Sequence, residues 1–201
     1  AVLLSACSSP KHEPMPLVNF TPSMEVTEVW SKGLSSAEGF LVPAVYDDMV
    51  FAAGGKTLTR LNARTGETEW SVSFDSPITG GVGSDGYVTA VGLWDGNLEV
   101  VDAEGKVSWE KKLTTELASP PVVSHGLVIA RTMDTRVSAF EASSGELQWT
   151  YQKSQPALTV RLPTRMLAHD NFLLVGQPNG HIVILDIASG KSMFEFQVAQ
   201  A

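Results

Sequence analysis

Four copies of one short motif recur along this chain, and their spacing of about 40 residues constrains the fold more than any other feature. Each copy has an apolar residue, an acid or amide, a small residue, turn residues that include a glycine, three further residues and an aromatic. The copies are LNARTGETEW (61–70), VDAEGKVSW (101–109), FEASSGELQW (140–149) and LDIASGKSMF (185–194). Their glycines are Gly66, Gly105, Gly145 and Gly190, at spacings of 39, 40 and 45 residues. A repeat of this length indicates one supersecondary unit that stacks on copies of itself.

Each repeat predicts four short strands joined by tight turns. The first turns are predicted at Asp47-Asp48, Asp85-Gly86, His125-Gly126 and Asp170-Asn171, and the second at Gly54-Gly55, Asp95-Gly96, Asp134-Thr135 and Asn179-Gly180. The second strands are predicted at Met49–Ala53, Tyr87–Val91, Leu127–Arg131 and Phe172–Gly176. Four antiparallel strands in about 40 residues are typical of a β-propeller blade. We therefore expect an all-β fold, a β-propeller with blades at about 40–75, 76–114, 118–153 and 163–198.

The aromatic series extends backwards to Trp30, which precedes Trp70 by 40 residues. The segment Val26–Trp30 resembles the later fourth strands, but no first three strands precede it. A propeller ring is often closed by a blade whose strands come from both ends of the chain. We therefore expect Trp30 on the outer strand of a closing blade, whose other strands would lie beyond Ala201 in a larger propeller. The alternative is that two such chains pair into one ring.

The first residues resemble the processing site of a bacterial lipoprotein. The apolar stretch 1–6 is too short to span a bilayer and is typical of the end of a signal peptide. Leu4-Ser5-Ala6-Cys7 resembles the lipobox, in which small residues fit the signal peptidase and the cysteine thiol carries the lipid. We expect Cys7 to be lipidated and the proline-rich stretch 7–24 to be a tether before the propeller at 25–201.

Composition excludes several classes of function. The formal net charge of −8 argues against a protein that binds nucleic-acid phosphates. A single cysteine excludes an intrachain disulfide, two-cysteine redox chemistry and a multi-cysteine metal site. His125, His169 and His181 are explained by their positions at hairpins, and His12 has no neighbouring ligand. Catalytic residues, a metal and a cofactor are therefore not expected.

Within the motif, the polar and aromatic positions predict structural roles. The side chains of Asn62, Asp102, Glu141 and Asp186 precede tight turns and are expected to accept hydrogen bonds from backbone N–H groups. The tryptophans of the first three copies, Trp70, Trp109 and Trp149, are expected to pack between blades rather than to stack on carbohydrate. Trp94-Asp95 is expected in a hairpin turn, which separates it from a WD repeat.

One irregularity concerns the stretch between the third and fourth repeats. The spacing of 45 places extra residues between Trp149 and Ala168, and the stretch 152–163 carries alternating apolar residues and an arginine. An insertion between blades lies on one rim of a propeller, where loops often bind partners. The alternative is that Leu158–Leu162 lengthens the first strand of the fourth blade, and the sequence favours neither interpretation.

The repeat motif resembles that of the quinoprotein-dehydrogenase-like propellers over about residues 40–200. The dehydrogenase branch uses pyrroloquinoline quinone with calcium and typically has an adjacent cysteine pair, which this chain lacks. The resemblance is stronger to the BamB family of outer-membrane assembly lipoproteins, through Cys7, the tether, Trp30 and the consecutive blades. It implies an eight-bladed ring and contact with the barrel subunit BamA through Leu158, Val160 and Arg161. The sequence departs from the family at Val160, where Leu is usual, and at Leu162, where Gly is usual.

The function that this resemblance implies is a non-enzymatic scaffold. It would be lipid-anchored at the periplasmic face of the outer membrane, bind BamA within the β-barrel assembly complex and assist insertion of outer-membrane proteins, with nascent outer-membrane proteins as further partners. A fragment of a periplasmic quinone-dependent dehydrogenase is the alternative. A sugar-binding propeller with exposed tryptophans is a third interpretation.

Overall fold

Four sheets, each containing four consecutive antiparallel strands, make up the structure, a computed structural model that describes residues 23–35, 40–153 and 164–198. The first sheet contains β2 (Ala44–Tyr46), β3 (Met49–Gly54), β4 (Thr57–Asn62) and β5 (Thr68–Ser73). The second contains β6 (Ile78–Ser84), β7 (Thr89–Leu93), β8 (Asn97–Val101) and β9 (Val107–Lys112). The third contains β10 (Val122–Ser124), β11 (Leu127–Arg131), β12 (Val137–Glu141) and β13 (Leu147–Tyr151). The fourth contains β14 (Leu167–His169), β15 (Phe172–Gly176), β16 (His181–Asp186) and β17 (Ser192–Gln197).

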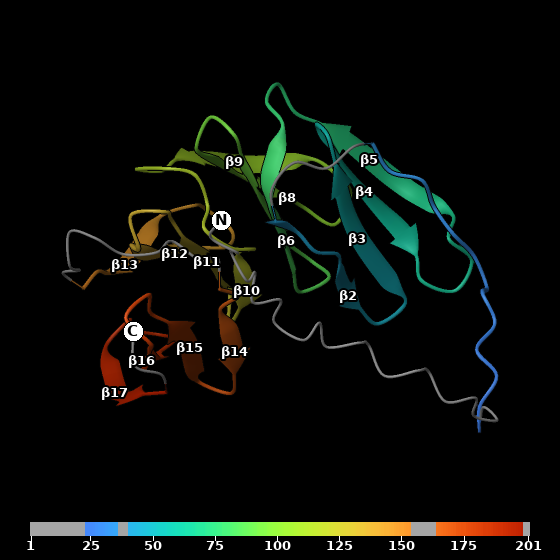
Figure 1. The fold of residues 1–201 in the computed structure, drawn as a ribbon. Helices are drawn as coiled ribbons and strands as arrows, with labels where there is room; N and C mark the ends of the chain where they lie inside the picture. The colour runs from blue at the N-terminus through green and yellow to red at the C-terminus, as the bar shows by residue number, and fades with distance from the viewer. Residues whose placement is uncertain (1–22, 36–39, 154–163, 199–201) are drawn as a thin grey trace, which may run out of the picture.

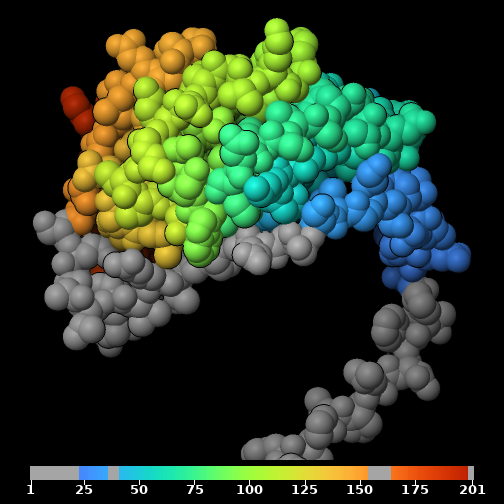
Figure 2. Space-filling view, turned by 90° about the horizontal axis from the view of Figure 1, so that it is seen from above, coloured from blue at the N-terminus to red at the C-terminus, as the bar shows by residue number. Residues whose placement is uncertain are grey.

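The strands of each sheet follow one another in chain order, and the sheets lie face to face around an arc (Figure 1). From above, segment 23–35 and the first three sheets follow one another around the same arc (Figure 2). Every third-to-fourth-strand pair has a register shift at the start of the motif, as between Arg60 and Leu61. This architecture confirms the expected fold class, all-β with propeller-type blades.

The turns adopt the backbone conformations that their residues favour. Asp47, His125 and Asp170 have φ of 47°, 55° and 48° at the first turns, and Gly86 takes the positive φ in the second sheet. These are residues that tolerate the left-handed region or occupy it at little cost. The expected hairpins are therefore confirmed, and His125 is a turn residue.

The hydrophobic core lies between neighbouring sheets rather than within one. One cluster joins the first two sheets around Phe51 and Val91, a second joins the middle sheets around Val100 and Phe140, and a third joins the last two around Trp149. Sheets are two-sided, so each middle sheet buries both faces against its neighbours. Sheet-to-sheet contact is therefore the main source of stability.

The outward face of the fourth sheet is left uncovered in the described structure. By register, Phe172 and Phe194 occupy the positions of Leu127 and Trp149 in the third sheet. Leu127 and Trp149 are 7% and 8% exposed, whereas Phe172 and Phe194 are 39% and 60% exposed. Apolar residues thus continue on a face for which the described residues provide no neighbouring sheet.

One expectation needs correction and another is not tested. The segment Val26–Trp30 is extended and pairs with no described strand, so its place as the outer strand of a closing blade stays a prediction. The strand expected from Tyr87 starts at Thr89, because Asp85 Oδ1 accepts hydrogen bonds from the N–H groups of Tyr87 and Val88 and keeps them in the turn.

One pairing was not expected from the sequence. The two-residue strand β1 (Phe40–Leu41) pairs in parallel with β6 and gives the second sheet a fifth strand. Val42 continues this pairing through a hydrogen bond from its N–H to the carbonyl of Gly81. The segment before the first sheet is thereby attached to the innermost strand of the second sheet.

No helix among the described residues is long and apolar enough to cross a membrane.

Candidate functional site

A tryptophan from the preceding part of the chain contacts each of the four sheets, and we call each of these four contacts a junction. The indole Nε1 of each tryptophan donates a hydrogen bond to a backbone carbonyl of the following sheet. The pairs are Trp30 to Ala63 (2.9 Å), Trp70 to Ala103 (2.9 Å), Trp109 to Ala142 (2.8 Å) and Trp149 to Ile187 (2.8 Å). Buried Trp requires such a partner for its N–H. The expectation that Trp70, Trp109 and Trp149 pack between blades is confirmed, and Trp30 makes the same contact without a sheet of its own.

The acid and amide positions of the motif fold its turn. Asn62 Oδ1 accepts from the N–H groups of Arg64 and Thr65, and Asp102 Oδ1 accepts from those of Glu104 and Lys106. Asp186 accepts from the N–H and hydroxyl of Ser189, which lowers the pKa of this carboxyl. These contacts confirm the expected role of the three residues.

The fourth such position differs from the other three. Glu141 has a longer side chain, and its Oε1 accepts at 3.5 Å from the hydroxyl of Ser143 rather than from a backbone N–H. The expectation of a backbone contact is therefore wrong at Glu141, because the extra methylene carries the carboxylate past the turn.

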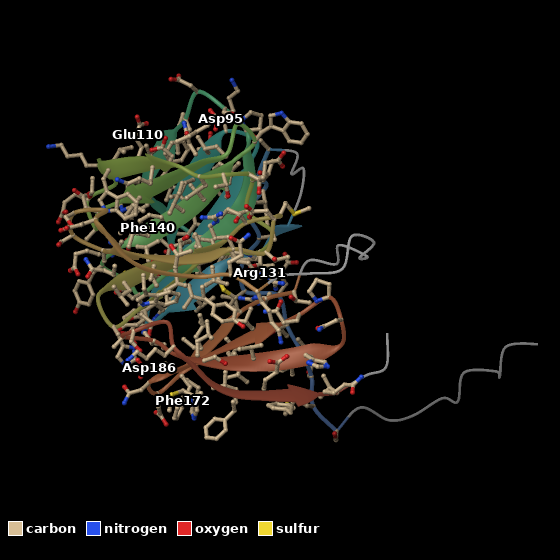
Figure 3. The ribbon with its side chains drawn as sticks, turned by 90° about the vertical axis from the view of Figure 1, so that its left-hand side faces the viewer. Asp95, Glu110, Arg131, Phe140, Phe172 and Asp186 are labelled. Atoms are coloured by element: carbon tan, nitrogen blue, oxygen red, sulfur yellow. The ribbon has the colours of Figure 1, made fainter. Side chains whose placement is uncertain are left out.

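One rim of the arc carries both the second turns and the connections between sheets. Strands alternate in direction, so β3–β4, β7–β8, β11–β12 and β15–β16 turn on the same side from which β5, β9 and β13 lead to the next sheet. Asp95 and Arg131 lie toward this rim, and Asp186 lies toward the opposite one (Figure 3). We call the first of these the connection rim.

The stretch predicted to bind a partner connects β13 to β14, and the end of β13 and the start of β14 both lie at the connection rim. Leu158, Val160 and Arg161 fall in 154–163, which lies outside the described residues. Cys7 also lies outside them, in 1–22. Neither interpretation of that stretch, loop or lengthened strand, is tested. The residues on both sides of it are described and are held by polar contacts.

The chain enters this stretch at a charged cluster. Lys153 Nζ lies 2.5 Å from Glu195 Oε1, and His181 Nδ1 lies 2.7 Å from the same oxygen. The hydrogen bonds from Lys153 and His181 lower the pKa of Glu195, which keeps this carboxylate ionised at neutral pH. One carboxylate thus binds the end of the third sheet and the third strand of the fourth.

The chain leaves the stretch at a buried arginine. Arg131 is 3% exposed and its Nη1 donates to the hydroxyl of Thr164 at 2.6 Å. The Thr164 hydroxyl in turn donates to the carbonyl of Gly176 in the fourth sheet. Arg131 lies where the third sheet meets the fourth (Figure 3), and its burial lowers the pKa of the guanidinium. It therefore ties the returning chain to both sheets.

A second acidic feature lies in the second sheet. Glu99 and Glu110 are cross-strand partners and share a hydrogen bond between their side chains. Glu99 is buried, and this burial, with the charge of Glu110, raises its pKa to about 7. At the same register positions the first sheet has Thr59 with Ser71, whose hydroxyls are 3.1 Å apart.

The described part of the chain contains no group of three or more His, Cys, Asp or Glu side chains placed to hold a metal ion. The four junction tryptophans use their N–H groups on backbone carbonyls, and the ring of each lies close to a motif glycine of the following sheet. What the connection rim offers is polar side chains and backbone on a rigid support, which suits contact with another protein.

Comparison with known proteins decides the family. The family model described as outer membrane protein assembly factor BamB matches residues 26–77 and 54–201. The chain belongs to the BamB family. An outer membrane protein assembly factor BamB from Burkholderia pseudomallei is 35% identical over 204 residues, which cover 98% of this chain and 54% of that protein. The chain thus spans about half the length of the curated BamB proteins it matches.

One solved structure supports the same assignment, and a second shares the fold. The crystal structure of BamB from Moraxella catarrhalis superposes with a TM-score of 0.69 at 27% identity, covering 80% of this chain and 49% of that one. A quinohemoprotein alcohol dehydrogenase from Pseudomonas putida superposes with a TM-score of 0.65 at 17% identity, covering 84% of this chain and 35% of that one. At this identity the dehydrogenase shares the fold alone.

The residues that sequence reasoning missed are Lys153, Glu195, Arg131 and Thr164 at the ends of the long connection. Glu195 and Thr164 acquire their partners only through strand register and the stacking of sheets, which the motif does not specify. A signal was nevertheless present. Arg131 occupies a position where the aligned residues of the other repeats are small, namely Ala53, Gly92 and Gly176.

Proposed function

We propose that this chain is part of a non-enzymatic scaffold of the outer-membrane β-barrel assembly machinery. It is anchored at the periplasmic face of the outer membrane by lipid on Cys7, and it binds the barrel subunit BamA through Leu158, Val160 and Arg161. Its role is to hold the machinery in a form that inserts outer-membrane proteins, with nascent outer-membrane proteins as further partners.

Membership of the BamB family carries this proposal. The structure adds that the inter-sheet connection with the extra residues leaves and re-enters the sheets at two polar contacts, those of Lys153 and Arg131. In an extended segment Leu158 and Val160 share one face, while Arg161 points to the other and offers a forked donor for a carboxylate or for carbonyls. Such a segment suits strand addition or shallow docking on a partner.

The dehydrogenase alternative rests on the shared fold of a distant neighbour. It requires calcium ligands and an adjacent cysteine pair in the protein that contains this chain. Finding both there would favour the alternative over the scaffold.

The deciding experiment is co-purification with BamA from outer membranes. In the intact protein, Arg161→Glu, or Leu158→Ala combined with Val160→Ala, is expected to abolish recovery of BamA. Interface anchors typically cost about 2 kcal/mol or more when truncated, roughly thirtyfold in affinity. The melting temperature serves as the control and is expected to stay within about 2 °C of the wild type. Unchanged BamA binding by folded variants contradicts the proposed contact, and unfolding of the variants assigns the segment to the core.

A further inference from the structure

The junction between the third and fourth sheets departs from its sister junctions at one position. In the second and third junctions, the residue four places after the tryptophan packs in the core between neighbouring sheets. It is apolar in the first three junctions, namely Leu34, Phe74 and Leu113. In the last junction it is Lys153, and the apolar contact is replaced by the ion pair with Glu195 and the contact of His181 with the same oxygen.

The same junction departs from the repeat a second time, at Arg131. Its equivalents Ala53 and Gly92 are small, and Leu117 of the preceding connection packs against Gly92. At Arg131 the corresponding contact is a hydrogen bond to Thr164, and the guanidinium is almost fully buried. The apolar contact of Leu117 with Gly92 in the second sheet is thus replaced in the third sheet by a hydrogen bond between Arg131 and Thr164.

Both departures lie at the ends of the one inter-sheet connection that carries extra residues. Lys153 is the last described residue before it and Thr164 the first after it. We propose that Lys153 with Glu195 and His181, and Arg131 with Thr164, are positioning residues that fix both ends of this connection for partner binding. This inference rests on the proposed function.

The physical argument is that these polar contacts fix the path of the chain and add little to the stability of the fold. An ion pair at the surface contributes little to stability, less than burial of the apolar residue found in the sister junctions. Stability therefore does not account for the lysine. A carboxylate that binds two cationic or donor groups fixes where the chain leaves the sheet, and a buried arginine fixes where it returns. A segment held at both ends loses less conformational freedom on binding, so the partner binds more tightly.

The test compares Lys153→Leu, which restores the residue type of Leu113, with two matched variants of the intact protein. Lys153→Arg keeps the ion pair. Lys112→Leu removes another lysine of the connection rim, one that donates to the carbonyl of Asp95 in the second sheet. We expect Lys153→Leu to weaken binding to purified BamA about tenfold without lowering the melting temperature. Lys153→Arg and Lys112→Leu are expected to bind within about twofold of wild type.

A second pair of variants guards against a misfolded protein. Glu195→Lys alone is expected to weaken binding, and combining it with Lys153→Glu is expected to restore it, because the exchanged pair rebuilds the contact. If Lys153→Leu and Glu195→Lys bind normally while Leu158→Ala with Val160→Ala does not, the positioning role is wrong. If the Leu158 and Val160 variant also binds normally, the proposed BamA contact itself is wrong. Loss of melting temperature in parallel with loss of binding assigns these residues to folding and overturns the inference.

Discussion

The indole of Trp109 lies so close to Gly145 that a Cβ atom on this glycine would stand 2.7 Å from Trp109 Cδ2. The same relation joins Trp30 to Gly66 and Trp149 to Gly190. Motif glycine and motif aromatic therefore act in pairs across junctions, each aromatic against the glycine of the following sheet. The motif requires glycine for two reasons. The tryptophan of the neighbouring junction leaves no room for a Cβ atom, and the turn itself has a positive φ, which is 70° at Gly145.

Gly126 and Gly145 allow the cost of the positive φ to be measured separately from the cost of the clash with tryptophan. Gly126 has a φ of 71°, and a methyl group on it would meet no atom within 4 Å, whereas Gly145 has a φ of 70° and faces Trp109. Gly126→Ala should cost about 1–2 kcal/mol of unfolding free energy for the left-handed backbone alone. Gly145→Ala should cost about 1–3 kcal/mol more because of the clash. Urea denaturation measures both, and equal losses would contradict the role of the tryptophan.

Trp109 itself allows the hydrogen bond and the packing to be measured separately. Trp109→Phe removes the donor to Ala142 and should cost about 1 kcal/mol, whereas Trp109→Ala leaves a cavity and should cost about 3–5 kcal/mol. The matched control is Trp94→Ala, since Trp94 is 60% exposed in the β7–β8 turn and should change stability by no more than about 0.5 kcal/mol. A loss at Trp94 as large as that at Trp109 would argue against the junction as the source of stability.

The carboxyl pair of the second sheet makes stability depend on pH. The pKa of Glu99 is about 7 in the folded protein against an ordinary value of 4.5 for the unfolded chain, so between these values the folded state binds more protons than the unfolded state. Its contribution is complete below pH 4.5 and is lost as pH rises through 7. The nearby carboxylates Glu110, Asp95 and Asp75 all act in the same direction. The loss amounts to at most about 3 kcal/mol.

Glu99→Gln tests this dependence, because the amide keeps a hydrogen-bond donor without titrating. Unfolding free energies measured from about pH 5 to about pH 8 should fall less steeply in this variant than in the wild type. Glu104→Gln, on the opposite rim and exposed, serves as the control and should leave the slope unchanged. Parallel slopes for wild type and Glu99→Gln would show that Glu99 is ionised throughout.

The proposed anchor predicts a change of location. Cys7→Ser removes the thiol that would carry the lipid, and several acyl chains anchor a protein firmly at about 0.8 kcal/mol per buried CH₂. The variant should be found as soluble periplasmic or unprocessed protein and should not incorporate labelled palmitate. Ser8→Ala is a suitable control and should remain in the membrane fraction. Retention of label and membrane association by Cys7→Ser would refute the anchor.

The uncovered face of the fourth sheet predicts self-association of the 201-residue chain on its own. Phe194, Phe196 and Val198 are 60%, 44% and 63% exposed on alternate positions of one stretch. Apolar patches of this kind associate in water. Light scattering after size exclusion should show oligomers, which Phe194→Ser with Phe196→Ser reduces. Tyr87→Ser, at a site of 72% exposure outside the fourth sheet, should have no such effect. A wild-type monomer at high concentration would contradict this prediction.

The fold was predictable because its signals are local. Asp-Gly, Asn-Gly and Gly-Gly turns and the motif glycines define hairpins within about ten residues, and their repetition defines the sheets. Trp70, Trp109 and Trp149 were recognised as packing residues from their period alone. The start of β7 was misplaced because a side-chain contact of Asp85 extends its turn.

The candidate site was less predictable because it depends on contacts between distant positions. Lys153 and Glu195 are 42 residues apart and meet only when the third and fourth sheets stack. Glu99 and Glu110 lie opposite each other only in one strand register. The parallel pairing of β1 with β6 likewise has no local sequence signal. Leu158, Val160 and Arg161 remain predictions from family resemblance.

The tryptophan contacts also indicate an order in which the sheets can assemble. In each of the first three junctions the indole belongs to a residue synthesised 33 positions before the carbonyl that accepts its N–H. Wherever the chain emerges with its amino terminus first, as in synthesis or in export across a membrane, every new sheet therefore meets an aromatic side chain that has already emerged, and Trp30 provides the first sheet with one at once. Assembly can proceed vectorially from the amino terminus, with each finished sheet acting as the template for the next.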